Sequence, residues 1–231
     1  MKSSVLGILA WGLLAGAAMG EPRPVVVELF TSQGCSSCPP ADALIVELSP
    51  RDDVIALALH VDYWDYIGWK DTFGDPKYSQ RQKNYARVAG ESTVFTPQIV
   101  VDGREHIVGY QPMKLAEVIN DSRREDSEVS LEITRQGNTV LVEAEAPARF
   151  SRPAEIHLVR YLPSQVVKIG RGENAGQAIE YANVVTSWDI AGKWDGRRPL
   201  QLNVDATGDL PIVVMIQLEG PRKVLAAARL R

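Results

Sequence analysis

Two cysteines are the residues of this chain best suited to covalent chemistry. Cys35 and Cys38, its only cysteines, lie three positions apart in the stretch TSQGCSSCPPAD. This spacing lets two sulfur atoms form a disulfide reversibly. At a helix start, free backbone N–H groups and the helix dipole stabilise a thiolate at the first cysteine. That thiolate attacks a partner disulfide, and the second cysteine then resolves the mixed disulfide. The pattern therefore predicts thiol–disulfide exchange, with Cys35 as nucleophile and Cys38 as resolving thiol.

The residues around the pair leave two questions open. Pro39 lacks a backbone N–H and fits a helix only in its first turn, so the helix begins either at Cys35 or at Pro39. A start at Pro39 places Cys35 one turn further from the dipole and weakens its activation. Glu28, in the apolar run before the pair, is a candidate proton acceptor for Cys38. The alternative for Glu28 is an ordinary strand acid that faces solvent or forms an ion pair.

Metal binding is the main alternative to redox chemistry. One CxxC offers two thiolates, whereas structural zinc takes four ligands, and the three histidines, His60, His106 and His157, have no ligand-like spacing. Copper(I) accepts two or three soft ligands, so Cys35, Cys38 and His60 form the alternative copper set. The redox interpretation needs no metal.

Two further alternatives keep the cysteines out of catalysis. A structural disulfide would close a ring of only four residues and remove little entropy from the unfolded chain, which makes a staple the weaker interpretation. Alternatively, the chain is an interaction module whose second half binds a partner while the cysteines are idle. No glycine-rich phosphate loop is present, so no organic cofactor is expected.

The first half of the chain alternates apolar runs with helix-compatible segments. Val25–Phe30 and Val54–Val61 read as buried strands on either side of a helix over Ala41–Leu48, which predicts a parallel β-α-β unit. The elements expected next are a helix over 75–90, strands over 96–103 and 105–110, and a helix over 111–122. This order, with a CxxC after the first strand and a proline opening the third, is the thioredoxin-like arrangement.

Thr96 and Pro97 open that third strand. In thioredoxin-like folds a cis proline faces the CxxC and presents a backbone edge to the bound peptide. Because a cis bond is costly except before proline, the order of elements predicts a cis Thr96–Pro97 bond and a substrate-binding role for both residues. The alternative is a trans proline that merely starts an edge strand.

The second half of the chain has a different texture. The charged, apolar-poor stretch over residues 120–128 predicts a domain boundary, and short alternating runs punctuated by turn residues follow it. The expected fold is an α/β thioredoxin-like domain over residues 21–124, followed by an all-β, sandwich-like domain over residues 125–231.

Two loops carry residue types that suit binding. The stretch DYWDYIGWKD after the second strand is dense in aromatic residues, and Trp64 and Tyr66 are the candidates for an apolar platform that binds an extended partner. The alternative is a small core beneath a long loop. RGENAG, residues 171–176, is either a turn with a local Arg–Glu contact or a loop that contacts the first half near the cysteines.

Residues 1–20 have the pattern of a secretory signal peptide. Lys2 is followed by an apolar run, Val5–Ala18, and by the small-x-small site Ala18-Met19-Gly20. The run is shorter than the roughly 20 residues that span a bilayer, which disfavours the alternative of a retained membrane helix. We therefore expect a periplasmic or secreted protein with no membrane span after cleavage, in a compartment where disulfides persist.

Composition excludes two classes of protein. Apolar residues make up 45% of the 231 residues and charged residues 23%, which is typical of a globular chain and not of a disordered one. The formal net charge is -4, and no stretch is basic enough to indicate nucleic-acid binding.

Several stretches together resemble one family of exported bacterial proteins, known as domain of unknown function 1223, whose first half resembles thioredoxin. The matching stretches are VVELFTSQGCSSCPPAD, HVDYWDYIGWKD, TPQIVVDG and RGENAG. The resemblance implies a thioredoxin-like fold and thiol–disulfide chemistry on exported proteins with thiols or disulfides, with a redox partner that resets the pair. Ser-Ser between the cysteines, in place of Gly-Pro, and the Pro-Pro after them depart from the thioredoxin motif and leave the direction of electron flow open.

Overall fold

The computed structural model describes residues 23–125, 127 and 129–231, so the expected signal peptide over residues 1–20 lies outside the described part. Within that part, three α-helices are present: α1 (Pro39–Leu48), α2 (Pro76–Ala89) and α3 (Pro112–Arg123), and a short 3-10 helix covers Asp65–Ile67. Each α-helix begins with a proline, because a helix's first turn has no use for the missing N–H. None of these helices is long and apolar enough to cross a membrane.

Eleven strands make up most of the ordered structure described. The strands are β1 (Val25–Thr31), β2 (Val54–His60), β3 (Gln98–Val101), β4 (Glu105–Val108), β5 (Ser130–Gln136), β6 (Thr139–Glu145), β7 (Ala154–Lys168), β8 (Ala178–Trp194), β9 (Leu200–Asp205), β10 (Ile212–Leu218) and β11 (Val224–Leu230). Eight of them form one mixed sheet in the order β11-β10-β7-β8-β2-β1-β3-β4. β1 and β2 are parallel neighbours in the sheet, and α1 connects them along the chain, which confirms the β-α-β unit.

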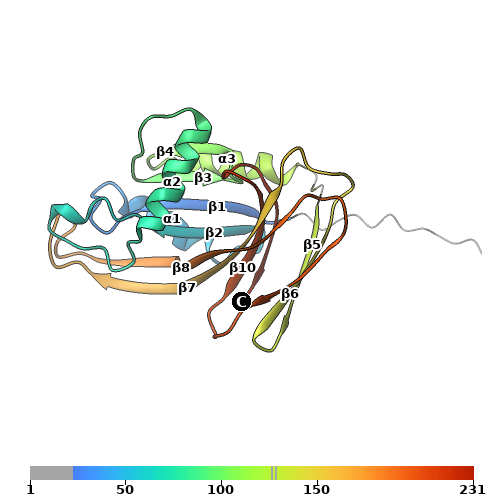
Figure 1. Ribbon diagram of the computed structural model, residues 1–231. Coiled ribbons are helices and arrows are strands. Elements are labelled where there is room, and N and C mark those ends of the chain that lie inside the picture. The colour runs from blue at the N-terminus through green and yellow to red at the C-terminus, as the bar shows by residue number, and fades with distance from the viewer. Residues whose placement is uncertain (1–22, 126, 128) are drawn as a thin grey trace, which may run out of the picture.

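The expected fold class is wrong. The order of elements up to α3 agrees with the sequence analysis, but these elements do not build a separate α/β thioredoxin-like domain. Strands β7, β8, β10 and β11 of the second half join the same sheet as β1–β4, through the contact of β8 with β2 (Figure 1). The physical reason is the edge of β2: its backbone groups need partners, and β8 pairs with that edge at Ala58 and Val184.

The β-rich second half therefore divides between two layers instead of forming a sandwich of its own. β5, β6 and β9 form a three-stranded sheet. The sheet's inner side chains, such as Val140 and Val142, pack in one cluster with Ile156 of β7 and Val214 of β10. Figure 1 shows β5 and β6 as a layer set apart from the β7–β8 hairpin. Where the chain divides into independently folding units stays a prediction.

The alternation of β1 determines which side chains can reach the cysteines. Val25, Val27 and Leu29 pack with α1 and α3 on one face of the sheet. Val26 and Phe30 pack with α2 on the other face. Successive side chains of a strand point to opposite faces, so Thr31 lies on the α1 face and Glu28 on the α2 face.

Candidate functional site

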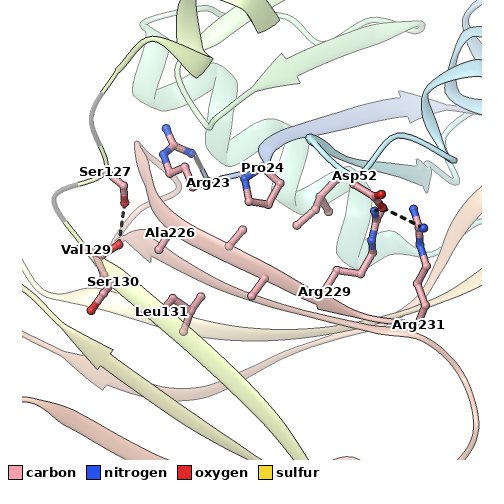
Figure 2. A pocket seen from close by; sticks show the side chains of 13 residues that line it. Arg23, Pro24, Asp52, Ser127, Val129, Ser130, Leu131, Ala226, Arg229 and Arg231 are labelled. Carbon is pink, nitrogen blue, oxygen red and sulfur yellow. Dashed lines mark hydrogen bonds and ion pairs between the residues drawn. The ribbon is translucent and has the colours of Figure 1, made fainter. Parts of the chain in front are cut away.

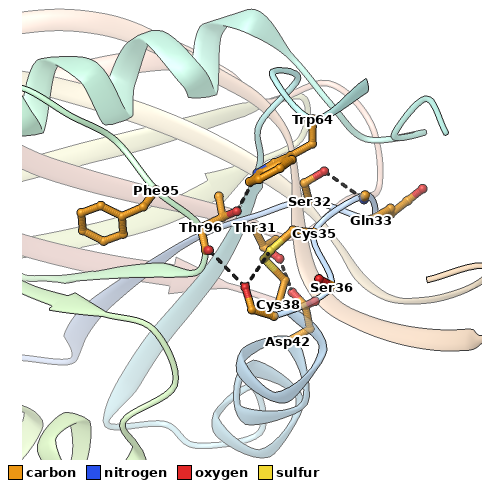
Figure 3. The surroundings of a disulfide bond; sticks show 12 residues. Thr31, Ser32, Gln33, Cys35, Ser36, Cys38, Asp42, Trp64, Phe95 and Thr96 are labelled. Atoms are coloured by element: carbon orange, nitrogen blue, oxygen red, sulfur yellow. Dashed lines mark hydrogen bonds between the residues drawn. A yellow bond between two sulfur atoms is a disulfide. The ribbon is translucent and has the colours of Figure 1, made fainter. Parts of the chain in front are cut away.

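Cys35 and Cys38 form a disulfide, with their Cα atoms 5.4 Å apart. The bond lies between the end of β1 and the start of α1 (Figure 3). Both cysteines are nearly fully buried, whereas Ser36 and Ser37 between them are exposed. The rim made by these two serines is therefore the exposed part of the ring.

Helix α1 begins at Pro39, and Cys38 is its N-cap residue, so the later of the two starts is the correct one. Pro39 and Pro40 have no backbone N–H, and the helix end therefore offers two fewer donors than usual to a thiolate at Cys35. The Ser37 Oγ lies 3.4 Å from the Cys35 Sγ.

The Thr96–Pro97 bond is cis, as the order of elements predicted. The Thr96 carbonyl accepts a hydrogen bond from the Ser37 hydroxyl at 3.4 Å, which places this segment beside the disulfide (Figure 3). The Trp64 indole N–H donates to the Thr96 Oγ1 at 2.7 Å. Thr96, Pro97 and Trp64 therefore border the same rim as the cysteines.

The aromatic loop divides between the two alternatives. Tyr63 and Trp64 are partly buried against the core on the α2 face, and Trp69 against a smaller cluster. Tyr66 is 79% exposed and stacks on Trp64, with ring centroids 6.4 Å apart. Trp64 and Tyr66 thus form an aromatic step next to Thr96, while the other two are core residues of the loop.

Asp42 is the residue of this site that the sequence analysis missed. It is 2% exposed and lies one helical turn after Cys38, whose carbonyl accepts the Asp42 backbone N–H at 3.0 Å. Residues four apart share a helix face, so the two side chains are neighbours. Thr31 donates to one Asp42 carboxyl oxygen at 2.7 Å. Burial raises the pKa of Asp42 to about 7, against the opposing effects of the nearby His60 and of the Thr31 hydrogen bond.

A buried histidine–aspartate pair stands behind Asp42. His60 Nδ1 lies 2.8 Å from the Asp71 carboxylate, which also accepts the backbone N–H of Gln33 at 2.7 Å. Burial by itself would raise the pKa of Asp71. The hydrogen bond to His60, the charge of His60 and two backbone N–H donors outweigh the effect of burial, so the pKa of Asp71 is lowered. Tyr181 packs edge-on against His60 at 4.9 Å. The cysteine loop is therefore tied through Gln33 to a buried polar cluster.

Glu28 is placed on the wrong face of the sheet to serve Cys38. It is fully buried on the α2 side, where Arg81 donates to both carboxylate oxygens at 2.6 and 2.9 Å. Tyr85 donates to it as well, at 2.6 Å. Of the two alternatives for Glu28, the ion pair is the one found.

The alternative copper set does not come together. His60 is fully buried and its Nδ1 is engaged by Asp71. In residues 23–125, 127 and 129–231, no group of three or more His, Cys, Asp or Glu side chains is arranged to hold a metal ion. Cys35 and Cys38 therefore have no third ligand in the described structure.

The RGENAG loop contacts the cysteine ring, which decides between its two alternatives. Asn174, only 2% exposed, donates to the carbonyls of Gln33 at 2.9 Å and Cys35 at 3.0 Å. Glu173 accepts the backbone N–H of Ser36 at 3.3 Å. The loop joins β7 to β8, so the second half of the chain supplies part of the site.

A cavity of about 680 Å³ lies elsewhere, at the amino ends of β1 and β2 (Figure 2). Its arginines are already occupied: Arg23 pairs with Asp102, and Arg229 and Arg231 with Asp52. Its lining includes no cysteine or histidine. We therefore place the candidate site at the disulfide.

A family model and several solved structures resemble this chain. The model described as "Protein of unknown function (DUF1223)" matches residues 26–217. The crystal structure of protein AGR_C_4864 from Agrobacterium tumefaciens is 29% identical, with a TM-score of 0.78, over 91% of this chain and 95% of that one. HBP35 of Porphyromonas gingivalis is 14% identical, with a TM-score of 0.63, over 90% of this chain and 75% of that one, and shows likeness of fold alone. No curated protein matches the chain.

Proposed function

We propose that this chain, which belongs to the DUF1223 family of proteins of unknown function, is an exported thiol–disulfide oxidoreductase. The proposal rests on the chemistry of its site, and its substrates are protein thiols and disulfides. The observation that carries the proposal is the Cys35–Cys38 disulfide, formed at the start of α1 under an exposed serine rim. A four-residue ring contributes little to stability, so chemistry is the better reason for it.

The exchange reaction uses the two sulfurs in turn. In the dithiol form, the Cys35 thiolate attacks one sulfur of a partner disulfide, and the partner's other sulfur leaves as a thiolate that takes up a proton. Cys38 then loses its proton and attacks Cys35, which releases the second partner thiol and restores the Cys35–Cys38 bond. Two electrons and two protons pass to the partner, and each step is reversible.

Neighbouring side chains support these two roles. The Ser37 hydroxyl, 3.4 Å from the Cys35 Sγ, donates its one proton to the thiolate when it leaves the Thr96 carbonyl. Asp42, beside Cys38, is the proton acceptor in this proposal, in place of Glu28. A carboxyl whose pKa is raised to about 7 takes up and returns protons most effectively near neutral pH.

The rim next to the disulfide supplies the binding edge. Thr96 and Pro97 present their backbone beside Ser37, and the exposed Tyr66 stacks on Trp64 at the same rim. An extended polypeptide that carries a cysteine would pair with that edge and pack on the aromatic step. Partners are exported proteins and a thiol reductant or oxidant that resets the pair, and no organic cofactor enters the reaction.

A redox titration of the mature protein in glutathione buffers tests the proposal. We expect the pair to interconvert reversibly between dithiol and disulfide, with a single midpoint measured by alkylation and mass spectrometry. Cys35→Ser should abolish exchange, and Cys38→Ser should trap a mixed disulfide with the partner. A disulfide that resists strong reductant in the folded protein, or tight one-to-one Cu(I) binding without exchange, would contradict the proposal.

A further inference from the structure

We infer that Glu173 sets the direction in which this disulfide works: its carboxylate disfavours the Cys35 thiolate, which makes the pair a reductant of partner disulfides. The inference rests on the proposed function and deepens it, because the spacing of the cysteines alone leaves the direction of electron flow open. The loop that carries Glu173, residues 171–176, comes from the β7–β8 hairpin, more than a hundred residues after the cysteines.

Two anchors hold this loop against the cysteine ring. Asn174 is buried and hydrogen-bonds the carbonyls on both sides of Gly34. Gly170 and Gly172 pack against Trp69, which a Cβ at either position would approach at 3.3 Å. Trp69 in turn donates to the Gln33 side chain at 2.8 Å. The position of Glu173 beside the ring is therefore determined by buried contacts, although its own side chain is exposed.

Glu173 occupies a donor that a thiolate would use. Its Oε2 accepts the backbone N–H of Ser36, the residue directly after Cys35. When Cys35 ionises, this N–H is already shared with a carboxylate, and the new negative charge forms on the residue next to the one that the carboxylate binds. A neighbouring like charge disfavours ionisation.

Little around the ring offsets this effect. Pro39 and Pro40 remove two N–H donors from the start of α1. Among the described residues, no lysine or arginine forms a hydrogen bond or ion pair with residues 32–38. Besides Glu173, the ionisable groups that lie next to the cysteine loop through hydrogen bonds in the described part of the chain are Asp42 on α1 and the His60–Asp71 pair behind Gln33. The Ser37 hydroxyl has one proton, which the Thr96 carbonyl accepts, so this hydroxyl donates to Cys35 only by giving up that bond.

The consequence for electron flow follows from the stability of the dithiol form. A CxxC pair whose reduced form holds a stabilised thiolate is strongly oxidising, and destabilising that thiolate makes the pair more reducing. A dithiol of this kind passes two electrons and two protons to a partner disulfide, which becomes two thiols while Cys35 and Cys38 become joined. A second dithiol protein must then reduce the pair, so the inference requires an exported dithiol donor.

Substituting the carboxylate by its neutral isostere tests the inference. In Glu173→Gln, at a pH above the pKa of Cys35, we expect the equilibrium with glutathione to shift about tenfold toward the dithiol form, which corresponds to a rise of about 30 mV in reduction potential. The pH midpoint for iodoacetamide alkylation of Cys35 should fall by about one unit. Glu180→Gln is the matched control, because Glu180 lies on the same hairpin, is exposed and contacts Ser164 instead of the cysteine ring.

Salt provides a readout that a merely structural role of Glu173 would not move. Because Glu173 is exposed, its charge is screened at high ionic strength. The wild-type potential should therefore rise toward that of Glu173→Gln between about 0.05 and about 1 M salt, while the variant's potential changes less.

The outcomes separate the inference from the proposed function. If wild type cycles reversibly but Glu173→Gln keeps the same potential and the same alkylation midpoint, the role of Glu173 is wrong and the oxidoreductase stands. If the wild-type pair does not cycle, both are overturned.

Discussion

The carboxyl of Asp42 links the chemistry of the site to the stability of the fold. It is held by Thr31 on one oxygen, while the other has no hydrogen-bond partner among the described residues. His60 Nε2 and the Tyr181 hydroxyl, which belong to the same buried cluster, are also without partners there. Burial without a second hydrogen-bond partner disfavours the charged form of this carboxyl relative to the protonated form, and its pKa is therefore raised.

We expect Asp42 to destabilise the folded protein as the pH rises. The pKa of this group is about 7 in the fold and near the ordinary value of 3.8 in the unfolded chain. Between these values the folded state binds one more proton, so the free energy of unfolding should fall by about 1.4 kcal/mol per pH unit. Asp42→Asn should remove this slope, which urea unfolding of the oxidised protein at several pH values measures. A variant that keeps the wild-type slope would show that another group is responsible.

Thr31 tunes the same carboxyl, because its hydrogen bond lowers the pKa of Asp42. In Thr31→Val, we expect a higher Asp42 pKa, and the pH at which thiol–disulfide exchange reaches half its maximal rate should move up. Thr186→Val is the matched control. Thr186 is exposed and donates a hydrogen bond to a backbone carbonyl of β7, far along the chain from the cysteines. An unchanged pH midpoint in Thr31→Val would argue against Asp42 as proton acceptor.

At the scale of elements, β8 is the strand that makes one sheet out of the two halves. Its Val184 lies opposite Ala58 of β2, and the neighbouring Asn183 donates to the Ala56 carbonyl at 2.8 Å. Asn183 also has a φ of 49°, in the left-handed region that few residues other than glycine, asparagine and aspartate adopt readily. One residue therefore supplies both the side-chain bond and the backbone conformation at this junction.

Two substitutions at Asn183 separate these contributions. Asn183→Ala loses the hydrogen bond, at about 1–3 kcal/mol, and adds the left-handed cost of roughly 1–2 kcal/mol. Asn183→Gly loses the bond but tolerates the backbone, so we expect it to be the more stable of the two in chemical denaturation. Equal loss in both variants would mean that the backbone conformation contributes nothing.

At the scale of the whole molecule, the two halves share one core. Val26, Phe30 and Leu57 of the first half pack in a single cluster with Val159 of β7 and Met215 of β10. Arg81 of α2 adds a polar link, because it bonds both Glu28 and Gln217 and stacks on Trp188 at 3.9 Å. Neither half buries these surfaces without the other.

We therefore expect residues 23–231 to unfold as one cooperative unit and a fragment that ends at residue 124 not to fold. Trp64 and Trp69 lie in the first half, and Trp188 and Trp194 lie in the second. The tryptophan fluorescence of one variant that keeps only the first pair, and of another that keeps only the second, reports the unfolding transition of each half. Coincident midpoints are the expected result. Two separate transitions, or a fragment with native near-ultraviolet circular dichroism, would favour the division at residues 124 and 125 instead.

Local patterns in the amino-acid sequence determined much of this protein by themselves. The apolar runs of β1 and β2 and the helix-compatible segments after them predict those strands and the three helices to within a few residues. The CxxC follows from local spacing, and the cis bond before Pro97 was predicted from the order of elements along the chain.

Tertiary structure alone decided that β8 pairs with β2 and which acid lies next to the cysteines. β8 was missed because its apolar and polar residues follow no single period, and so the joining of the halves was missed with it. Glu28 and Asp42 are both acids near the cysteines in sequence, but the alternation of β1 turns Glu28 to the opposite face while the turn of α1 brings Asp42 back to Cys38. Contacts between residues far apart, such as Glu173 and Ser36, depend on how complete elements pack, and no local pattern encodes them.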